Sequence, residues 1–333
     1  MSLLDFIKKK YLHNDANVLN KIKSKFNFKG TDCTINSFGE MNKDKIFYVI
    51  QRSPGAGLFS NLIFILNHLN IAQKHGFIPF IDMENFSTIY NEKNKIFNTK
   101  NAWEYYFEPV SKFSKKDVYK SKKVIITHNK FYKFFSHNLH EFNTIFKKYI
   151  KIKKIYNTKA NIFIKKNFLN KKILAVHYRG TSYKTSAGHP YPTTFKQITK
   201  KIDRLIYKKN YQKIFLCTED LNMFNKLKKK YDNNICYYNS FRSKKDDAFI
   251  KYPRKNHRYL LGEEILIESF IISKCHGFIF VDSNVSNFVK FISKIRLYRI
   301  NNGFNSLNEY SAKWLWYIKF ILPSFIGGFK KDI

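Results

Sequence analysis

Short apolar runs alternate along the chain with longer stretches in which apolar residues recur every three or four positions, and this alternation predicts strands followed by helices. In the first half, one strand is predicted at 46–51 and a second at 77–82. A Gly-rich turn at 54–57 and a helix at about 59–75 lie between them, and Gly76 ends that helix. A strand–loop–helix–strand unit of this kind predicts two parallel neighbouring strands.

The remainder of the first half gives weaker signals. We expect a short amphipathic helix at the start of the Lys- and Asn-rich segment 1–45 and an aromatic segment at 101–110. A short strand is expected at 124–129, followed by helical structure across 131–170.

The second half repeats the strand–helix pattern four times. Strands are predicted at 171–180, 213–220, 234–240 and from 277 onward, helices at 193–209, 221–231 and about 257–274, and a closing segment at 295–301. Such repeats predict an open, doubly wound sheet, and two α/β domains with polar loops at the carboxyl ends of their strands predict a ligand cleft between them. The predicted domains are 1–168 and 169–300, followed by a helical, aromatic segment at 301–333.

The chain of 333 residues is strongly basic, with 61 Lys and Arg against 24 Asp and Glu and a formal net charge of +37. Its 44% hydrophobic content excludes a disordered protein. We interpret most of the charge as a solvated, Lys-rich surface; the alternative is a field that attracts anionic partners. A non-catalytic nucleic-acid-binding protein is less favoured, because the charge is spread along the chain and no helix-turn-helix, zinc-finger or RNP pattern occurs.

Cysteine usage and hydropathy favour a cytoplasmic protein. The four Cys show no CxxC spacing, which indicates reduced thiols rather than a disulfide framework or a zinc site. The N-terminal stretch lacks the apolar core of a secretory signal, and no apolar run is long enough for a spanning helix. The segment 314–329, "WLWYIKFILPSFIGGF", either lies at a membrane interface or packs as a C-terminal helix.

Arginine occurs at only eight positions, so each of them is informative. In "ILAVHYRGTS" the predicted strand carries His177, Arg179, Gly180 and Thr181 to its carboxyl end, where an open sheet presents ligands. A guanidinium can hold a diphosphate with two parallel hydrogen bonds and stabilise the charge that builds on a departing phosphate. The alternative is a loop arginine that forms a surface ion pair.

"VHYRGTS" resembles the H-x-R-x-T-D signature of the fucosyltransferase superfamily, which includes nodulation, core-glycan and protein O-fucosyltransferases. Segments similar to that superfamily follow the same order within 48–80 and 172–290, and "RGTSYKTSAGHPYP" is similar to its bacterial relatives. The resemblance implies a GT-B-like α/β fold, with two Rossmann-like open-sheet domains facing a cleft. It also implies an inverting, metal-independent glycosyltransferase that uses GDP-fucose and needs no cofactor. In agreement, no HExxH, paired His/Asp or DxD motif occurs.

The resemblance implies roles for individual residues of the second domain. Arg179 matches the arginine that binds the β-phosphate, His177 the histidine beside guanine and ribose, and Glu268 the carboxylate that accepts hydrogen bonds from guanine. The diphosphate cradle is expected to comprise Gly180, Thr181, Asp282, Ser283, Asn284 and Ser286, with the last four at a helix N-terminus. Ser182 departs from the signature, which has Asp at this place.

Other candidates are less specific. Glu219, the second catalytic candidate after Arg179, and Asp220 end a strand. They either anchor the ribose or support the fold behind the site, or act as general base on the acceptor hydroxyl, or cap the next helix. In the first domain, the acceptor side, the spacing of Gly55, Gly57 and Asn61 is by itself a weak signal for a phosphate loop. The resemblance implies that this loop closes over the sugar diphosphate or contacts the acceptor. Candidates for further phosphate or acceptor contacts are Arg52, Arg254, Arg258 and His189.

The sequence therefore predicts an enzyme that moves fucose from GDP-fucose to a hydroxyl of a bacterial cell-surface glycan or lipid-linked oligosaccharide. We expect it in the cytoplasm, peripheral to the inner membrane, with no nucleic acid as partner. A GT-B glycosyltransferase that uses another nucleotide sugar is the alternative.

Overall fold

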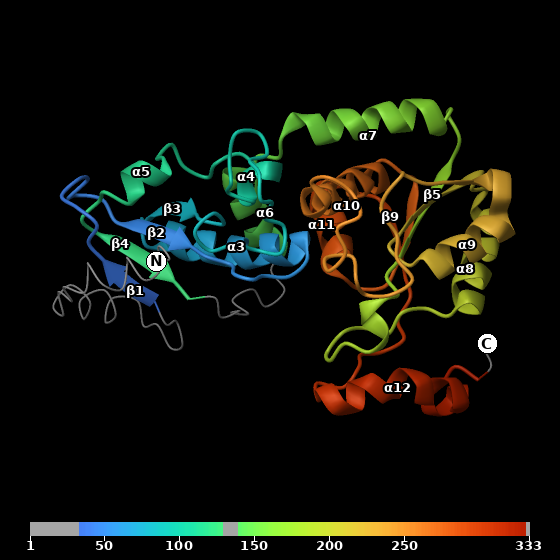
Figure 1. The fold of residues 1–333 in the computed structure, drawn as a ribbon. Coiled ribbons are helices and arrows are strands. Elements are labelled where there is room, and N and C mark those ends of the chain that lie inside the picture. Colours follow the sequence, from blue (N-terminus) through green and yellow to red (C-terminus); the bar gives the residue numbers. More distant parts are fainter. Residues whose placement is uncertain (1–32, 129–138, 331–333) are drawn as a thin grey trace. The chain divides into compact units, whose positions relative to one another are not determined.

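The computed structural model describes residues 33–128 and 139–330. The chain folds into two compact units, Met1–Lys153 and Lys154–Ile333 (Figure 1). The amphipathic helix expected at the start of the chain lies outside the described residues.

The first unit is built on a four-stranded sheet with the strand order β1-β4-β2-β3. β2 pairs in parallel with β3, as the strand–loop–helix–strand pattern predicted. β2 also pairs in parallel with β4, and β1 pairs antiparallel with β4. β1 was not predicted, because its residues are mostly half-buried and form no apolar run. The bounds are β1 Cys33–Asn36, β2 Phe47–Ile50, β3 Ile78–Ile81 and β4 Val124–Thr127.

Helix α3 (Leu58–Lys74) follows β2 and is buried along most of its length. Even its polar residues are internal: His68 is 1% exposed and its Nδ1 lies 2.9 Å from the Tyr48 hydroxyl. Burial, together with the nearby charge of Arg52, lowers the pKa of His68 to about 3, so this histidine is a neutral core residue. The aromatic segment predicted at 101–110 contains the short helix α4 (Trp103–Tyr106), and α5 is Lys115–Val118.

The helical stretch predicted at 131–170 is interrupted. Helix α6 (Leu139–Tyr149) is separated from α7 (Lys154–Asn167) by an extended segment in which Ile152 pairs with Phe107. This pairing uses backbone groups that would otherwise continue a helix.

The unit boundary falls just before α7, whereas the sequence places it at 168, because α7 packs on α10 (His257–Ser273) of the second unit.

The second unit contains a five-stranded sheet with the order β7-β6-β5-β8-β9, in which every pair is parallel. Its strands are β5 Ile173–Tyr178, β6 Lys213–Thr218, β7 Ile235–Cys236, β8 Gly277–Phe280 and β9 Arg296–Arg299. The chain runs outward from β5 through β6 to β7 and then returns to place β8 on the other side of β5. The reversal makes the carboxyl ends of β5 and β8 the switch point, where open α/β sheets bind ligands.

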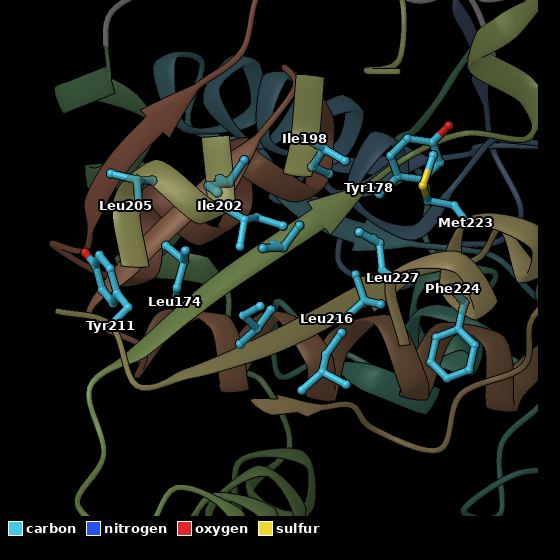
Figure 2. Packing of buried hydrophobic residues seen from close by; sticks show 14 residues of the cluster. Leu174, Tyr178, Ile198, Ile202, Leu205, Tyr211, Leu216, Met223, Phe224 and Leu227 are labelled. Carbon is cyan, nitrogen blue, oxygen red and sulfur yellow. The ribbon is translucent and has the colours of Figure 1, made fainter. Parts of the chain in front are cut away.

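Alternate residues of β5 face two different layers. Leu174, Val176 and Tyr178 pack into a cluster with side chains from α8 (Phe195–Lys209) and α9 (Leu221–Tyr231), as Figure 2 shows. Because side chains alternate along a strand, His177 faces the opposite layer. The remaining helices are α11 Asn284–Ile292 and α12 Glu309–Ile321.

The segment after β9 is tied to the loop that follows β5. Pro190 and Phe304 form an antiparallel bridge, and backbone hydrogen bonds join Gly188 to Ser306 and Tyr191 to Gly303 at 2.8 and 3.0 Å. The C-terminal helix α12 thereby packs on the second unit. None of the four cysteines, all of which lie within the described residues, forms a disulfide, and three of them are buried.

Candidate functional site

The loop after β5 passes so close to its neighbours that residue 180 must be glycine. A Cβ on Gly180 would lie 2.3 Å from Cε1 of Tyr178 and 2.6 Å from Oδ2 of Asp220. Asp220 is fixed in turn, because its Oδ1 accepts the Met223 N–H at 2.9 Å and so caps α9, while Lys184 Nζ lies 3.2 Å from its Oδ2. Asp220 is therefore the helix cap that the sequence left as one of its alternatives.

Glu219 holds this loop through a single carboxylate oxygen. Its Oε1 accepts the Gly180 N–H at 3.0 Å, the Thr181 N–H at 3.3 Å and the Thr181 hydroxyl at 3.1 Å. Arg179 Nη1 lies 3.4 Å from the same oxygen. Burial alone would raise the pKa of Glu219, but the Arg179 charge and the hydrogen bonds hold it below its ordinary value. Glu219 is thus an ionised anchor of the loop.

Arg179 emerges from the end of β5 with its guanidinium oriented on three sides. Nη2 donates to Ser182 Oγ at 3.1 Å, Nη1 faces Glu219, and Cζ lies 5.3 Å from the centre of the Tyr183 ring. The side chain is still 35% exposed. Ser182 thus replaces the signature Asp with a neutral acceptor, which leaves more of the positive charge of Arg179 available to an anion.

Two buried polar groups lie on the α10 side of the sheet. His177 pairs in register with Cys217 of β6, so both side chains face α10, and Cys217 donates its S–H to Oε2 of Glu268 on that helix at 3.2 Å. His177 and Glu268 are 4% and 3% exposed, and His177 Nδ1 and Glu268 Oε1 have no hydrogen-bond partner within the described residues. Such buried atoms are costly unless a ligand satisfies them.

The pKa values of these two groups are shifted in opposite directions. Burial lowers the pKa of His177 to about 4, with Glu219 opposing and Arg179 reinforcing the shift, so the imidazole is neutral at physiological pH. Burial raises the pKa of Glu268 to about 7, although the Arg242 charge opposes it. A buried carboxyl that titrates near neutrality is typical of functional sites.

Arg242 is a site residue that the sequence interpretation passed over. Its Nη2 lies 3.9 Å from Glu268 Oε1, and the guanidinium donates to the carbonyl oxygens of Ser240 and Tyr238 at 2.8 and 2.9 Å. Its side chain is only 7% exposed and stacks 4.2 Å from the Phe224 ring centre. Arginine is scarce in this chain. The scarcity that singled out Arg179 applied equally to Arg242.

The N-terminus of α11 lies after β8, beside β5. Ser283 is the N-cap: its hydroxyl accepts the Ser286 N–H at 3.1 Å, and Ser286 Oγ accepts the Ser283 N–H at 3.0 Å. Ser286 is fully buried, and its Oγ also donates to the Ser283 carbonyl oxygen at 2.8 Å, so its hydroxyl is part of the helix cap. Asp282 forms ion pairs with Arg299 and, at 3.8 Å, Lys290.

Two of the additional candidates in the second unit have structural partners. Arg254 Nη1 lies 2.5 Å from Glu264 Oε1 and its Nε donates to His257 at 3.1 Å. His189 is exposed, with its Nδ1 2.9 Å from the Ala187 carbonyl oxygen and its ring 4.8 Å from that of Tyr183. Arg258 Nε is buried and has no hydrogen-bond partner in the part of the chain that the structure describes.

The remaining candidates belong to the first unit. Gly55 has a φ of +72°, which favours glycine, and Asn61 Oδ1 accepts the Ala56 N–H at 2.9 Å, so the α3 helix holds the Gly-rich loop. Gly57 precedes α3 as its N-cap. The Arg52 guanidinium lies 4.6 Å from the Phe64 ring centre, and burial lowers its pKa.

Across residues 33–128 and 139–330, no three His, Cys, Asp or Glu side chains come together as potential metal ligands. Over the same ranges, no helix combines the length and the apolar character needed to cross a membrane.

No protein-family model and no curated protein matches the sequence. Among solved structures, the chain is similar to NodZ α-1,6-fucosyltransferase co-crystallised with GDP, with 14% identity over 78% of this chain and 96% of that chain and a TM-score of 0.51. It is also similar to fucosyltransferase NodZ from Bradyrhizobium, with 13% identity over 80% and 99% and a TM-score of 0.51. NodZ soaked with GDP-fucose gives a TM-score of 0.50 at 14% identity, over 75% and 93%. At these identities the similarity concerns the fold alone, and the predicted GT-B-like α/β fold is confirmed.

Proposed function

We propose that this chain, which has the fold of the GT-B fucosyltransferases, is an inverting, metal-independent enzyme that transfers fucose from GDP-fucose to a hydroxyl of a bacterial cell-surface glycan. The observation that carries the proposal is the position of Arg179. It lies at the sheet's switch point, in a loop anchored by Glu219, with part of its guanidinium exposed. The fold neighbours that bind GDP and GDP-fucose support the donor, and the likeness of residues 179–192 to bacterial relatives supports the acceptor class.

In this proposal the guanine is recognised on the α10 side of the sheet. Its N1–H and exocyclic amine are two parallel donors, which a carboxylate accepts together, and Glu268 Oε1 has no hydrogen-bond partner among the described residues. Donation to the carboxylate favours its ionised form and so draws its pKa downward on binding. The neutral His177 can direct a ring nitrogen at the nucleoside without placing a second charge there.

Departure of GDP is assisted by Arg179. As the sugar–oxygen bond breaks, negative charge builds on the β-phosphate, and a fixed guanidinium stabilises this charge more in the transition state than in the ground state. The main-chain N–H groups at the start of α11 add a partial positive charge beside the same loop. Removing one such donor typically costs about 10²–10³ in rate.

We assign Glu219 a positioning role in place of the catalytic one. A general base works best with a pKa near the operating pH, whereas the pKa of Glu219 is held below its ordinary value. Its Oε1 is also occupied by the loop N–H groups and the Thr181 hydroxyl. Its contribution is to fix where Arg179 points.

The test is nucleotide selectivity combined with an arginine substitution. We expect GDP to raise the melting temperature more than UDP, CMP or ADP, and expect Arg179→Lys to reduce GDP release from GDP-fucose by about 10²–10³ while the protein stays folded. Arg204→Ala is the matched control, since Arg204 is exposed on α8. A larger thermal shift with UDP or CMP would overturn GDP-fucose as the donor. Near-native turnover of Arg179→Lys would refute the assignment of Arg179 to the active site.

A further inference from the structure

Helix α12 has apolar side chains on two opposite faces. On one face, Ala312 and Trp316 are buried, with Trp316 packed against Tyr191 and Phe329. On the other, the exposed fractions are 80% for Tyr310, 68% for Trp314, 59% for Tyr317 and 72% for Ile321. These four positions recur at the spacing of one helical stripe, and we call them the α12 outer stripe.

The outer stripe is held outward by the fold. Trp316 lies 6.2 Å from the Tyr191 ring and 5.3 Å from the Phe329 ring, centre to centre, and fixes the rotation of the helix. Asn305 Nδ2 donates to the Ala312 carbonyl oxygen at 3.1 Å and to the Ser186 carbonyl oxygen at 3.2 Å. Turning the stripe inward would therefore require the opposite face to leave its cluster.

Exposed apolar residues extend the surface at both ends of the helix. Leu307 precedes α12 with 88% of its surface exposed, and Phe325 and Ile326 follow it with 86% and 54%. Figure 1 shows α12 at the lower margin of the second unit, beside the segment that connects to β9. Large apolar side chains exposed in this number on one element and its two ends often mark an interaction site.

Charge and composition indicate the partner. The chain carries a net charge of +37, so two copies repel each other, whereas a negatively charged lipid surface attracts the protein. Within α12 the only acidic residue is Glu309, and Lys313 beside the stripe is exposed. Trp and Tyr, which make up three of the four stripe residues, concentrate at the level of lipid headgroups because their rings are amphipathic.

The length of the helix decides how it meets a bilayer. α12 has 13 residues, about 20 Å, against the roughly 20 residues that a spanning helix needs. Helices with one apolar face instead lie in the plane of the interface, with that face among the headgroups and upper acyl chains.

We propose that the α12 outer stripe docks this protein on an anionic lipid bilayer. The stripe inserts into the headgroup region, Lys313 and the basic surface contact the anionic headgroups, and the Trp316 face keeps the helix attached to the second unit. This proposal is independent of the proposed reaction, because lipid binding is measured without donor or acceptor.

Trp314 supplies a specific readout. The chain has three Trp residues, and Trp103 and Trp316 are 3% and 5% exposed, so a change of fluorescence on docking reports Trp314. With vesicles of phosphatidylglycerol and phosphatidylethanolamine we expect a blue shift and co-sedimentation of the full chain, both weaker at high salt. Phosphatidylcholine vesicles should bind far less. Trp314→Phe should abolish the shift and retain most of the binding.

Substitution of the stripe tests the surface itself. The triple variant Trp314→Ser/Tyr317→Ser/Ile321→Ser should bind anionic vesicles at least about tenfold more weakly, equivalent to about 1.4 kcal/mol. Its circular dichroism should stay native, because the changed side chains are exposed. The matched control Tyr207→Ser/Ile250→Ser removes apolar side chains that are 88% and 84% exposed elsewhere, and should bind like the parent.

Three outcomes would overturn the proposal. One is equal vesicle binding by the triple variant and the parent, and another is no vesicle binding by the parent. The third is a parent that is dimeric by light scattering and becomes monomeric in the triple variant, which would assign the stripe to a second copy of this chain.

Discussion

Replacing Glu268 with glutamine should make the protein more stable and at the same time impair its binding of GDP. Glu268 Oε1 has no hydrogen-bond partner among the described residues, and burial raises the pKa of this carboxyl to about 7. A residue that costs stability in the absence of ligand and is needed for binding is the mark of a functional site.

The sign and size of the stability change follow from proton linkage. The pKa of Glu268 is raised from the ordinary 4.5 of a glutamate to about 7, so between these pH values the folded protein holds a proton that the unfolded chain has released. Stability therefore falls as pH rises through this window, and above it the ionised carboxylate costs about 3 kcal/mol, at roughly 1.4 kcal/mol for each pH unit. Glu268→Gln removes this cost because the amide stays neutral.

The assay is thermal unfolding of both proteins between pH 5 and pH 8.5, with and without GDP. For a domain of this size we expect Glu268→Gln to melt on the order of 5–10 °C higher at pH 8.5, and close to the parent at pH 5. Its affinity for GDP should fall about ten- to a hundredfold, because the amide keeps only one, uncharged, acceptor oxygen and turns an NH₂ group toward the second guanine donor. Glu309→Gln, at the exposed start of α12, is the control.

Two results would refute this reasoning. If Glu268→Gln were less stable than the parent at every pH, the carboxylate would be a satisfied structural group. If the variant bound GDP as tightly as the parent, the guanine would be recognised elsewhere.

Three further substitutions test the loop and the C-terminal helix. Gly180→Ala places a Cβ 2.3 Å from the Tyr178 ring, so we expect a loss of about 1–3 kcal/mol in unfolding free energy and a loss of the GDP-induced thermal shift. Glu219→Gln should lower turnover more than it changes the KM for the donor. Because the pKa of Glu219 is lowered in the folded parent, its ionised carboxylate stabilises the fold at neutral pH. The Glu219→Gln variant should therefore be less stable than the parent at neutral pH, and the difference should vanish on acidification, as urea unfolding can measure. Trp316→Ala should cost about 3–5 kcal/mol and increase proteolysis within α12.

Much of the second unit could be predicted from the sequence, because its elements have a strong local signature. β5 and β6 are buried apolar strands, and α8 carries Ile198, Ile202 and Leu205 on one face. β7 is shorter than predicted, since only Ile235 and Cys236 pair with β6. A segment forms a strand only where a neighbouring segment pairs with it. The residues beyond Cys236 have the composition of a strand but do not pair with β6.

The candidate site was predictable to the extent that topology determines it. Arg179 and Gly180 directly follow β5, so their location at the ligand-binding edge of the sheet can be predicted from topology without any tertiary contact. The role of Glu219 depends on which groups its carboxylate meets, and its partners Gly180 and Thr181 lie 39 and 38 positions away in the chain. Asp220 instead caps α9 through the nearby Met223 N–H, which is a local pattern. Arg242 was passed over because it follows a short strand with a weak pattern, so only tertiary packing brings it beside Glu268.

The bridge between Pro190 and Phe304 makes the end of the chain a structural support for the loop beyond Arg179. A protein shortened to residue 300 would leave the Gly188 and Tyr191 N–H groups without their acceptors and would uncover the aromatic ring of Tyr191. Truncation for crystallisation or expression should therefore spare residues 301–330.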